Sequence, residues 1–142
     1  MKLEDVIRSK GSSVVTIAPT ASVTELVSLM ADHNIGAVVV SSDGATIEGI
    51  VSERDVVRGL AQRGAEAVDA TVADLMTVDV VVGSPEDRIE ETAHTMTVRR
   101  VRHVPIRVDG KLAAIVSIGD VVKYRIDQLT DERNHLLDYL HT

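Results

Sequence analysis

Apolar and polar residues follow two different periods along this chain, and the order of these periods predicts its elements. Short runs of β-branched residues predict strands, and stretches with apolar residues three or four positions apart predict helices. The first half contains a helical turn, a strand, a helix, two strands joined by a turn at 41–44, and a second helix; these fall at residues 4–8, 13–17, 22–34, 37–40, 47–51 and 52–63. In the first long helix, Val23, Leu26, Val27 and Met30 form the apolar stripe that we expect to be buried.

The second half repeats this order. Its strands fall at 80–82, 102–108 and 112–116, and a helix capped within 84–87 follows the first of them. Pro19 and Pro85 correspond at a spacing of 66, as do Met30 and Met96. We therefore expect an α/β (α+β) fold made of two pseudo-symmetric β-α-β-β-α repeats, at residues 1–64 and 72–124, with a connector at 65–71. Halves of about sixty residues have little core of their own, so the two should pack as one body.

The most specific repeated stretch runs from a strand into a helix. Gly49-Ile50-Val51-Ser52-Glu53-Arg54-Asp55 is matched 65 residues later by Ala114-Ile115-Val116-Ser117-Ile118-Gly119-Asp120. This order places a hydroxyl and a carboxylate at a helix N-terminus, where backbone N–H groups and the helix dipole favour a phosphate. The simpler interpretation is a capping box, which is common. The duplication of the whole unit favours a binding site over a cap alone.

The last predicted helix continues past the repeat as an extension at 125–142. An apolar stripe runs along it almost to the end of the chain, through Ile118, Val122, Ile126, Leu129, Leu136 and Leu140. One interpretation is a helix folded back on its own domain. We favour a contact with a second subunit, because a stripe of this length extends beyond the second repeat.

Composition and charge exclude several functions. The chain has two Tyr and no Phe or Trp, so it lacks the aromatic platforms on which single-stranded nucleic acids stack. Its net charge of −7 also disfavours nucleic-acid binding. It has no cysteine, and therefore neither disulfides nor thiolate zinc ligands. No signal-peptide core and no apolar run of membrane-spanning length occurs, so we expect a cytoplasmic protein.

No residue pattern indicates catalysis. The five histidines do not have metal-ligand spacing, no Ser–His–Asp set can be assembled, and phosphate-loop and dinucleotide motifs are missing. Asp55 and Asp120 lie in different repeats, which makes them poor candidates for an acid–base pair. We expect a binding module that is not an enzyme and has no metal site.

With both motifs in place, the chain resembles a tandem pair of CBS domains, the arrangement called a Bateman module, of the stand-alone bacterial type. The resemblance covers roughly residues 3–124. The two Ser-x-x-Asp stretches carry it, supported by His33-Asn34-Ile35-Gly36-Ala37-Val38-Val39-Val40 and by Arg100-Val101-Arg102-His103-Val104-Pro105-Ile106. This resemblance implies a regulatory module with two clefts between the repeats.

The resemblance also implies an adenine nucleotide ligand, such as AMP, ADP, ATP or NAD(P), and no catalytic cofactor. In such pairs the motif Asp binds the ribose hydroxyls, while the motif Ser and the helix N-terminus bind phosphate. The expected nucleotide-binding residues are Ser13, Val15, Ile35, Gly36, Ala37, Ile50, Ser52, Arg54, Asp55, Val80, Val81, Val101, Arg102, His103, Ile115, Ser117 and Asp120. Asp120 would face residues 13–15 and 35–37 of the first repeat, and Asp55 would face Val80, Val81, Val101 and His103.

The two clefts should differ in charge. Five basic residues lie within nine positions of this acidic chain: Arg99, Arg100, Arg102, His103 and Arg107. One or two of them, together with Arg54, are candidates for binding phosphate, because guanidinium groups donate in pairs. The second motif has Ile118-Gly119 in place of Glu53-Arg54. We therefore expect the Asp55 cleft to accept a larger or more highly charged nucleotide.

Two functions follow from this sequence. The first is a sensor whose ligand changes the packing of the repeats and thereby affects a partner or a second subunit, with a homodimer as the expected assembly. The alternative is an oligomerisation scaffold whose clefts are vestigial and which acts through the long C-terminal helix. A third hypothesis, a nucleotide-processing enzyme, is disfavoured.

Overall fold

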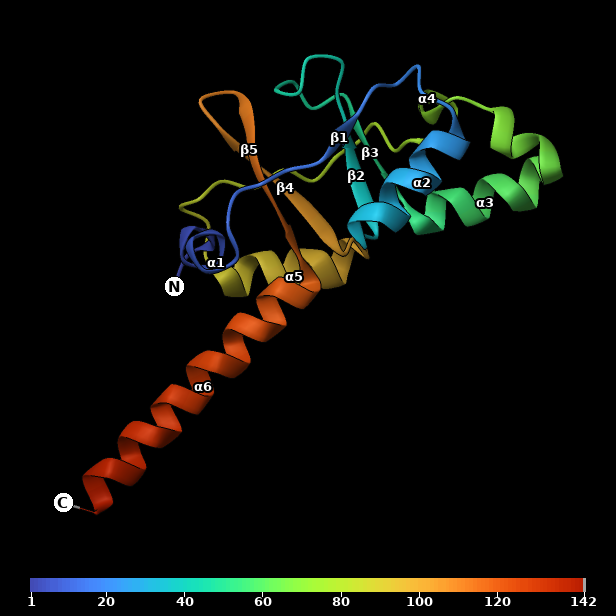
Figure 1. Ribbon diagram of the computed structural model, residues 1–142. Helices are drawn as coiled ribbons and strands as arrows, with labels where there is room; N and C mark the ends of the chain where they lie inside the picture. Colours follow the sequence, from blue (N-terminus) through green and yellow to red (C-terminus); the bar gives the residue numbers. More distant parts are fainter. Residues whose placement is uncertain (142) are drawn as a thin grey trace.

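The computed structural model describes residues 1–141 (Figure 1). Its elements, in chain order, are α1 (Leu3–Lys10), β1 (Thr16–Ile17), α2 (Val23–His33), β2 (Ala37–Val40), β3 (Gly49–Ser52), α3 (Glu53–Arg63), a 3₁₀ helix (Gly64–Asp69), α4 (Val72–Leu75), α5 (Ile89–Arg99), β4 (His103–Val108), β5 (Lys111–Ser117) and α6 (Ile118–Leu140). The expected mixed fold with a long C-terminal helix is confirmed. In the first repeat the order β1-α2-β2-β3-α3 is the predicted β-α-β-β-α.

Two small sheets form the centre of the molecule. In the first, β1 pairs parallel with β2, and β2 pairs antiparallel with β3, so that Val39 lies opposite Ile50. In the second, β4 and β5 form an antiparallel hairpin in which Val104 lies opposite Val116. All four side chains of β2 are buried, as its uninterrupted apolar run predicts.

The first strand of each repeat is shorter than the sequence predicts. The strand expected at 13–17 is reduced to Thr16–Ile17, and the strand expected at 80–82 does not form. Only Gly83 pairs with β4, through its N–H to Pro105 O at 2.9 Å and its C=O to Arg107 N at 3.0 Å. The next parallel bond would need an N–H from Pro105, which proline lacks, so the ladder stops there.

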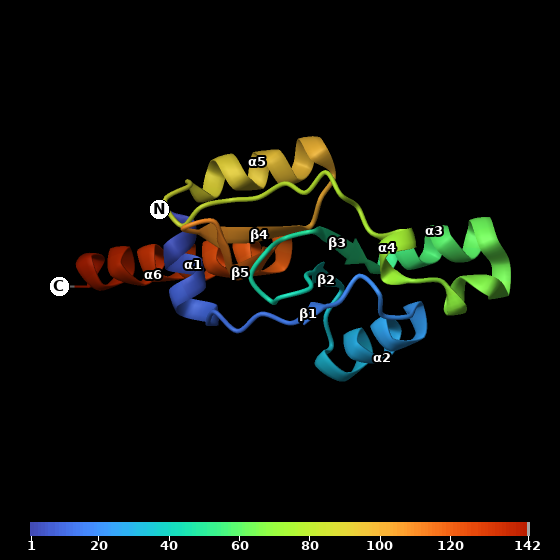
Figure 2. The same ribbon diagram turned by 90° about the horizontal axis from the view of Figure 1, so that it is seen from above.

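The two hydrophobic cores exchange helices. Leu3 and Val6 of α1 are buried in the core of the second repeat, while Val72 of α4 is buried in the core of the first. An isolated β-bridge lies beside each exchanged helix: Lys2, before α1, pairs with Arg88, and Thr71, before α4, pairs with Ser22. Figures 1 and 2 show α1 at the same end of the molecule as α5 and α6, and α4 beside α2 and α3. The repeats therefore form one body, as expected.

Several helix residues lie differently from the prediction. Val23, Leu26 and Met30 are buried, but Val27 is 45% exposed, so the buried stripe of α2 is narrower than expected. The helix of the second repeat begins at Ile89 with Arg88 at its N-cap, and Ser84 lies outside it. Beyond the body, α6 projects away from both repeats (Figure 1), so it does not fold back on its own domain.

We predict that Gly49→Ala destabilises the fold. A Cβ at Gly49 would lie 2.9 Å from Thr77 O, and that backbone is held in place by hydrogen bonds with Ile50. Overpacking of this kind costs about 1–3 kcal/mol, measurable as a lower midpoint in urea unfolding. Gly119→Ala is the matched control, because its Cβ would meet only Ser117 Oγ at 3.6 Å. Equal midpoints for Gly49→Ala and the unchanged protein would contradict the packing described here.

Candidate functional site

The first Ser-x-x-Asp motif forms a closed capping box at the start of α3. Ser52 is the N-cap, and its backbone N–H donates to Asp55 Oδ2 at 2.9 Å. Its hydroxyl donates to the same oxygen at 3.1 Å and accepts from Asp55 N at 3.4 Å. The capping interpretation is thus confirmed for this motif. Both hydrogen bonds from Ser52 to the Asp55 carboxylate go to Oδ2, so Oδ1 takes no part in the capping box.

The second motif repeats this geometry at the start of α6. Ser117 N–H donates to Asp120 Oδ2 at 2.9 Å, and Asp120 N donates to Ser117 Oγ at 3.1 Å. In both helices the first residue also has a partner from the preceding strand region, because Glu53 N donates to Gly36 O and Ile118 N to Arg102 O. Two of the first three N–H groups are therefore already used. A phosphate at either helix would depend more on side-chain cations than the sequence alone indicates.

A lysine contacts the second motif. Lys10 Nζ, at the last residue of α1, lies 2.6 Å from Asp120 Oδ2 and 2.7 Å from Ile115 O. Burial raises the pKa of the Asp120 carboxyl, but hydrogen bonds from Lys10 and Ser117 outweigh burial and leave that pKa below its usual range. Asp55 has no ion pair among the contacts of residues 1–141.

His103 lies between the two helix starts. It opens β4 opposite Ser117 and is half-buried, near the charges of Asp120 and Glu53. Burial lowers the pKa of His103 below its ordinary 6.5, and the nearby carboxylates only partly oppose this. The imidazole is therefore mostly neutral at pH 7, and Lys10 supplies the positive charge that faces Asp120.

A cavity of about 370 Å³ lies where the first repeat meets the second. Three arginines line it, Arg54 from α3 with Arg100 and Arg102 from the segment before β4, and its remaining lining comes from Met96, Thr97, Val101 and Ile118. These three guanidinium groups form no ion pair within the described chain, whereas the neighbouring Arg99 pairs with Asp79 at 3.3 Å. Unpaired cations in one concave surface of an acidic protein form a suitable site for an anion.

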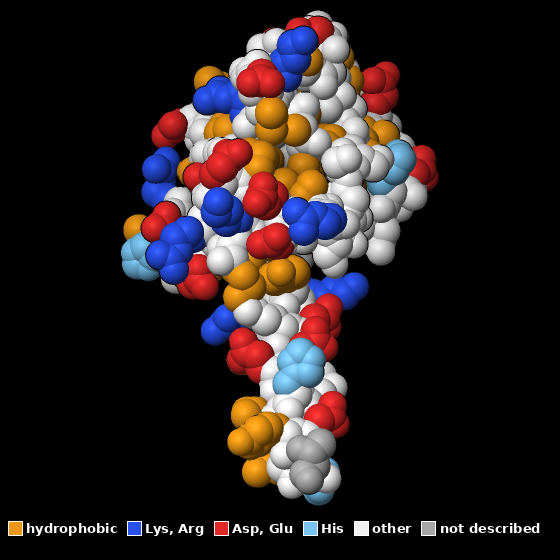
Figure 3. Space-filling model, turned by 90° about the vertical axis from the view of Figure 1, so that its left-hand side faces the viewer, with side chains coloured by type: hydrophobic (Ala, Val, Ile, Leu, Met, Phe, Trp, Pro, Cys, Tyr) orange, Lys and Arg blue, Asp and Glu red, His pale blue; other side chains and the backbone are white. Residues whose placement is uncertain are grey.

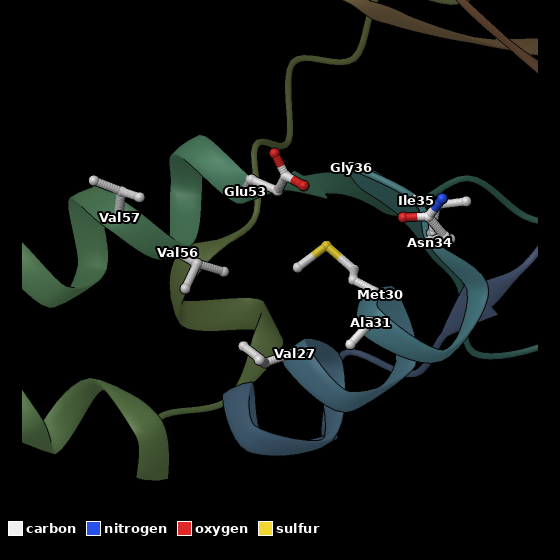
Figure 4. A pocket seen from close by; sticks show the side chains of 9 residues that line it. All are labelled: Val27, Met30, Ala31, Asn34, Ile35, Gly36, Glu53, Val56 and Val57. Atoms are coloured by element: carbon white, nitrogen blue, oxygen red, sulfur yellow. The ribbon is translucent and has the colours of Figure 1, made fainter.

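The first repeat has an equivalent cavity of about 430 Å³ between α2 and α3 (Figure 4). Its lining matches the arginine cavity at the repeat spacing, since Met30, Asn34 and Gly36 correspond to Met96, Arg100 and Arg102. In Figure 4, Met30 points into the cavity and Glu53 lies at the start of α3. One cavity therefore carries a carboxylate and no arginine, and the other carries three arginines and no carboxylate.

The remaining predicted residues lie on strands or in segments without regular secondary structure beside them. Ala37 pairs with Ser52, and Ile50 with Val39, on the first sheet. Val15 packs against the first core, and Val81 packs against the second. Ile35 and Gly36 line the cavity with Glu53, and Asp120 is not in its lining. The assignment of the predicted residues to two separate nucleotide clefts stays a prediction, and so do the roles expected for Ser13 and Val80.

The sequence does not predict where three residues of this region lie. It predicts Arg100 only as one member of a basic cluster, and the equivalence of Arg100 to Asn34, at a spacing of 66, is the signal for its place in the cavity. It predicts Glu53 only as part of the motif. Lys10 gave no signal, because a lysine in the last turn of a helix is sufficiently explained by the helix dipole.

Comparisons with known proteins identify the family. The sequence model of the CBS domain matches residues 3–62 and 72–127. In Arabidopsis thaliana, the CBS domain-containing protein CBSX3, mitochondrial, is 32% identical over 146 residues, which cover 97% of this chain and 71% of that protein. The fold and both repeats therefore define a CBS-domain pair, and the chain belongs to the CBS-domain family.

Solved structures agree with this assignment. The CBS-domain containing protein ATU1752 from Agrobacterium tumefaciens is 40% identical and superposes with a TM-score of 0.85, covering 88% of this chain and 99% of that one. The CBS domain pair of MJ0100, crystallised in complex with 5′-methylthioadenosine and S-adenosyl-L-methionine, shares the fold with a TM-score of 0.78 at 20% identity, covering 90% and 98% of the two chains.

Residues 1–141 lack two further features. No helix there is long and apolar enough to span a bilayer. No group of three or more His, Asp or Glu side chains is placed to hold a metal ion.

We predict that His103 makes the protein less stable in mild acid. Its folded-state pKa lies below 6.5, so the unfolded chain binds this proton first, and the free energy of unfolding falls as the pH drops from about 7 toward 5. His103→Gln should flatten this part of the curve, measured by urea unfolding at a series of pH values. His135→Gln, on the exposed part of α6, is the matched control. The same slope in the unchanged protein and in His103→Gln would contradict the burial of a neutral imidazole.

Proposed function

We propose that this protein is a non-catalytic regulatory module that binds an adenine nucleotide, such as AMP, ADP, ATP or NAD(P), at the two Ser-x-x-Asp helix starts. The observation that carries the proposal is the duplicated site itself. Two helices begin with the same serine and carboxylate at the junction of the repeats, and cations lie beside both. The ribose hydroxyls would bind the motif carboxylates, because each keeps Oδ1 outside its capping box.

A solved structure with the same fold supports the choice of ligand. The MJ0100 pair was crystallised with two adenosine derivatives, 5′-methylthioadenosine and S-adenosyl-L-methionine. An adenosine moiety needs no aromatic platform if backbone groups on small aliphatic strands bind the base, and this chain offers such strands near both motifs. A ligand with a ribose and an adenine therefore suits both the family and the side chains available here.

The two clefts would prefer different charges. The cavity lined by Arg54, Arg100 and Arg102 suits two or three phosphate groups near the first motif. The cavity with Glu53, whose lining does not include Asp120, offers an anion no cation. Arg100 also has a left-handed backbone, with φ of 54°. Its equivalent, Asn34, has φ of 52°, which asparagine adopts more easily. Both residues are the C-caps of their helices, where a left-handed residue ends the helix.

The signal would pass through α6 to a second copy of the chain. Its apolar side chains are exposed beyond the body, including Ile126 at 56%, Leu136 at 64% and Leu140 at 74%. Figure 3 shows hydrophobic side chains gathered on one side of the projecting helix. Because α6 begins at Ser117 and Asp120, a ligand at this helix start would act directly on the element that we propose pairs in the dimer.

The scaffold interpretation uses the same helix without the ligand. In that case α6 would mediate assembly, the clefts would be vestigial, and no nucleotide would stabilise the protein. The three arginines that line one cavity favour the sensor, since together they offer an anion several hydrogen-bond donors.

We predict that nucleotides stabilise the protein through the motif carboxylates. A ligand at about a hundred times its dissociation constant adds about 2.7 kcal/mol of stability, which a thermal-shift series with AMP, ADP, ATP, NAD, NADP and S-adenosylmethionine would detect. Asp55→Ala should abolish most of the ATP shift and Asp120→Ala should spare it. Asp127→Ala, on the outer part of α6, is the control.

Each shift is measured against the same variant without ligand, because loss of a capping box alone costs about 1 kcal/mol. If the protein is purified free of nucleotide and no ligand shifts its melting, the scaffold interpretation replaces the sensor.

We predict that the apolar side of α6 holds a homodimer together. Leu136→Glu places a charge in the proposed contact, which should weaken dimerisation by roughly tenfold or more, measured by sedimentation equilibrium. His135→Glu adds a charge to the same turn, about 100° around the helix and outside the apolar stripe, and should leave the dimer intact. A monomeric unchanged protein, or equal weakening by both substitutions, would contradict this proposal.

A further inference from the structure

Lys10 distinguishes the two motif carboxylates. Its ammonium lies 2.6 Å from Asp120 Oδ2 and 2.7 Å from Ile115 O, and the side chains of Lys10 and Asp120 are 29% and 25% exposed. No lysine or arginine occurs between Arg63 and Arg88, the stretch that connects α3 to α5. Asp55 therefore has no counterpart of this lysine, although its motif matches that of Asp120 residue for residue at Ser and Asp.

The position of Lys10 is fixed by the fold and not by a flexible tail. Leu3 and Val6 anchor α1 in the core of the second repeat, and Leu3 N donates to Asp87 O at 2.9 Å. The helix ends at Gly11, whose φ of 94° turns the chain toward β1. Lys10 thus reaches the start of α6 from a helix that the second repeat holds in place.

We propose that Lys10 is a specificity-determining residue, which makes the Asp120 cleft prefer 5′-phosphorylated nucleosides to uncharged ones. This inference rests on the proposed function, because it assumes that the ribose binds Asp120. An uncharged nucleoside would bind at Oδ1 of Asp120 while Lys10 holds Oδ2, and it offers the ammonium no new partner. A 5′-phosphate offers Lys10 an anion at the start of α6.

The local sequence shows why a lysine from outside the motif is needed. The second motif has Gly119 where the first has Arg54, and Ile118 N already donates to Arg102 O. His103, the other basic group beside Asp120, is kept mostly neutral by burial. Arg102 lines the arginine cavity with Arg54 and Arg100. Among residues 1–141, Lys10 is the one contact of Asp120 with a permanent positive charge.

The test compares AMP with adenosine by isothermal titration calorimetry, in the full chain carrying Asp55→Ala so that the Asp120 cleft is measured alone. Adding Lys10→Met should weaken AMP binding and leave adenosine binding nearly unchanged. The preference for AMP, given by the ratio of the two dissociation constants, should fall by about tenfold or more, as expected for one charge-assisted hydrogen bond. Lys10→Arg keeps the charge and should keep the preference. Lys111→Met, at the exposed end of the β4–β5 hairpin, controls for the loss of one positive charge.

The outcomes separate this inference from the proposed function. If both ligands bind and Lys10→Met leaves their ratio unchanged, or moves both affinities in the same direction by the same factor, the role of Lys10 is refuted and the sensor stands. If neither ligand binds the chain with or without Asp55→Ala, both are refuted. A melting curve of each variant without ligand shows that the fold is kept, because Lys10 lies outside both cores.

Discussion

The exchange of α1 and α4 between the two cores is the constraint on which the rest of this structure depends. Leu3 and Val6 are almost completely buried against the second repeat, and Val72 against the first. Burying a side chain of this size contributes about 1.5–3 kcal/mol, so each exchange is a substantial part of the stability of a small domain. The exchange of α1 brings Lys10 to Asp120. The exchange of α4 brings Thr77, which follows this helix, to Ile50 of β3. Neither repeat has its complete core or its complete site alone.

The same atoms serve stability and the proposed binding. In each motif the serine and the carboxylate close a capping box, which fixes the first turn of α3 or α6 before any ligand arrives. A preformed site of this kind loses little conformational freedom on binding. The two sites nevertheless differ in charge, because cations reach them from different elements. Three arginines lie near the first motif, and one lysine from α1 contacts the second.

Much of the fold could be predicted from local sequence, because strands, helices and caps leave periodic signals. The repeat, the strand at 37–40 and both Ser-x-x-Asp caps are examples. The missing first strand of the second repeat could not be predicted from residues 80–82, since it depends on Pro105 in the neighbouring strand. The pairing of Lys10 with Asp120 joins residues 110 positions apart, and it follows from the helix exchange rather than from any motif.

The most direct measurement of the central claim is a set of amide NMR spectra of the full chain, recorded during titration with AMP and with ATP. If nucleotides bind at the two helix starts, the largest shift changes will fall at residues 52–55 and 117–120, with changes at Arg100 and Arg102 when ATP is added. Saturable changes confined to other surfaces, or no changes at millimolar nucleotide, would contradict the account.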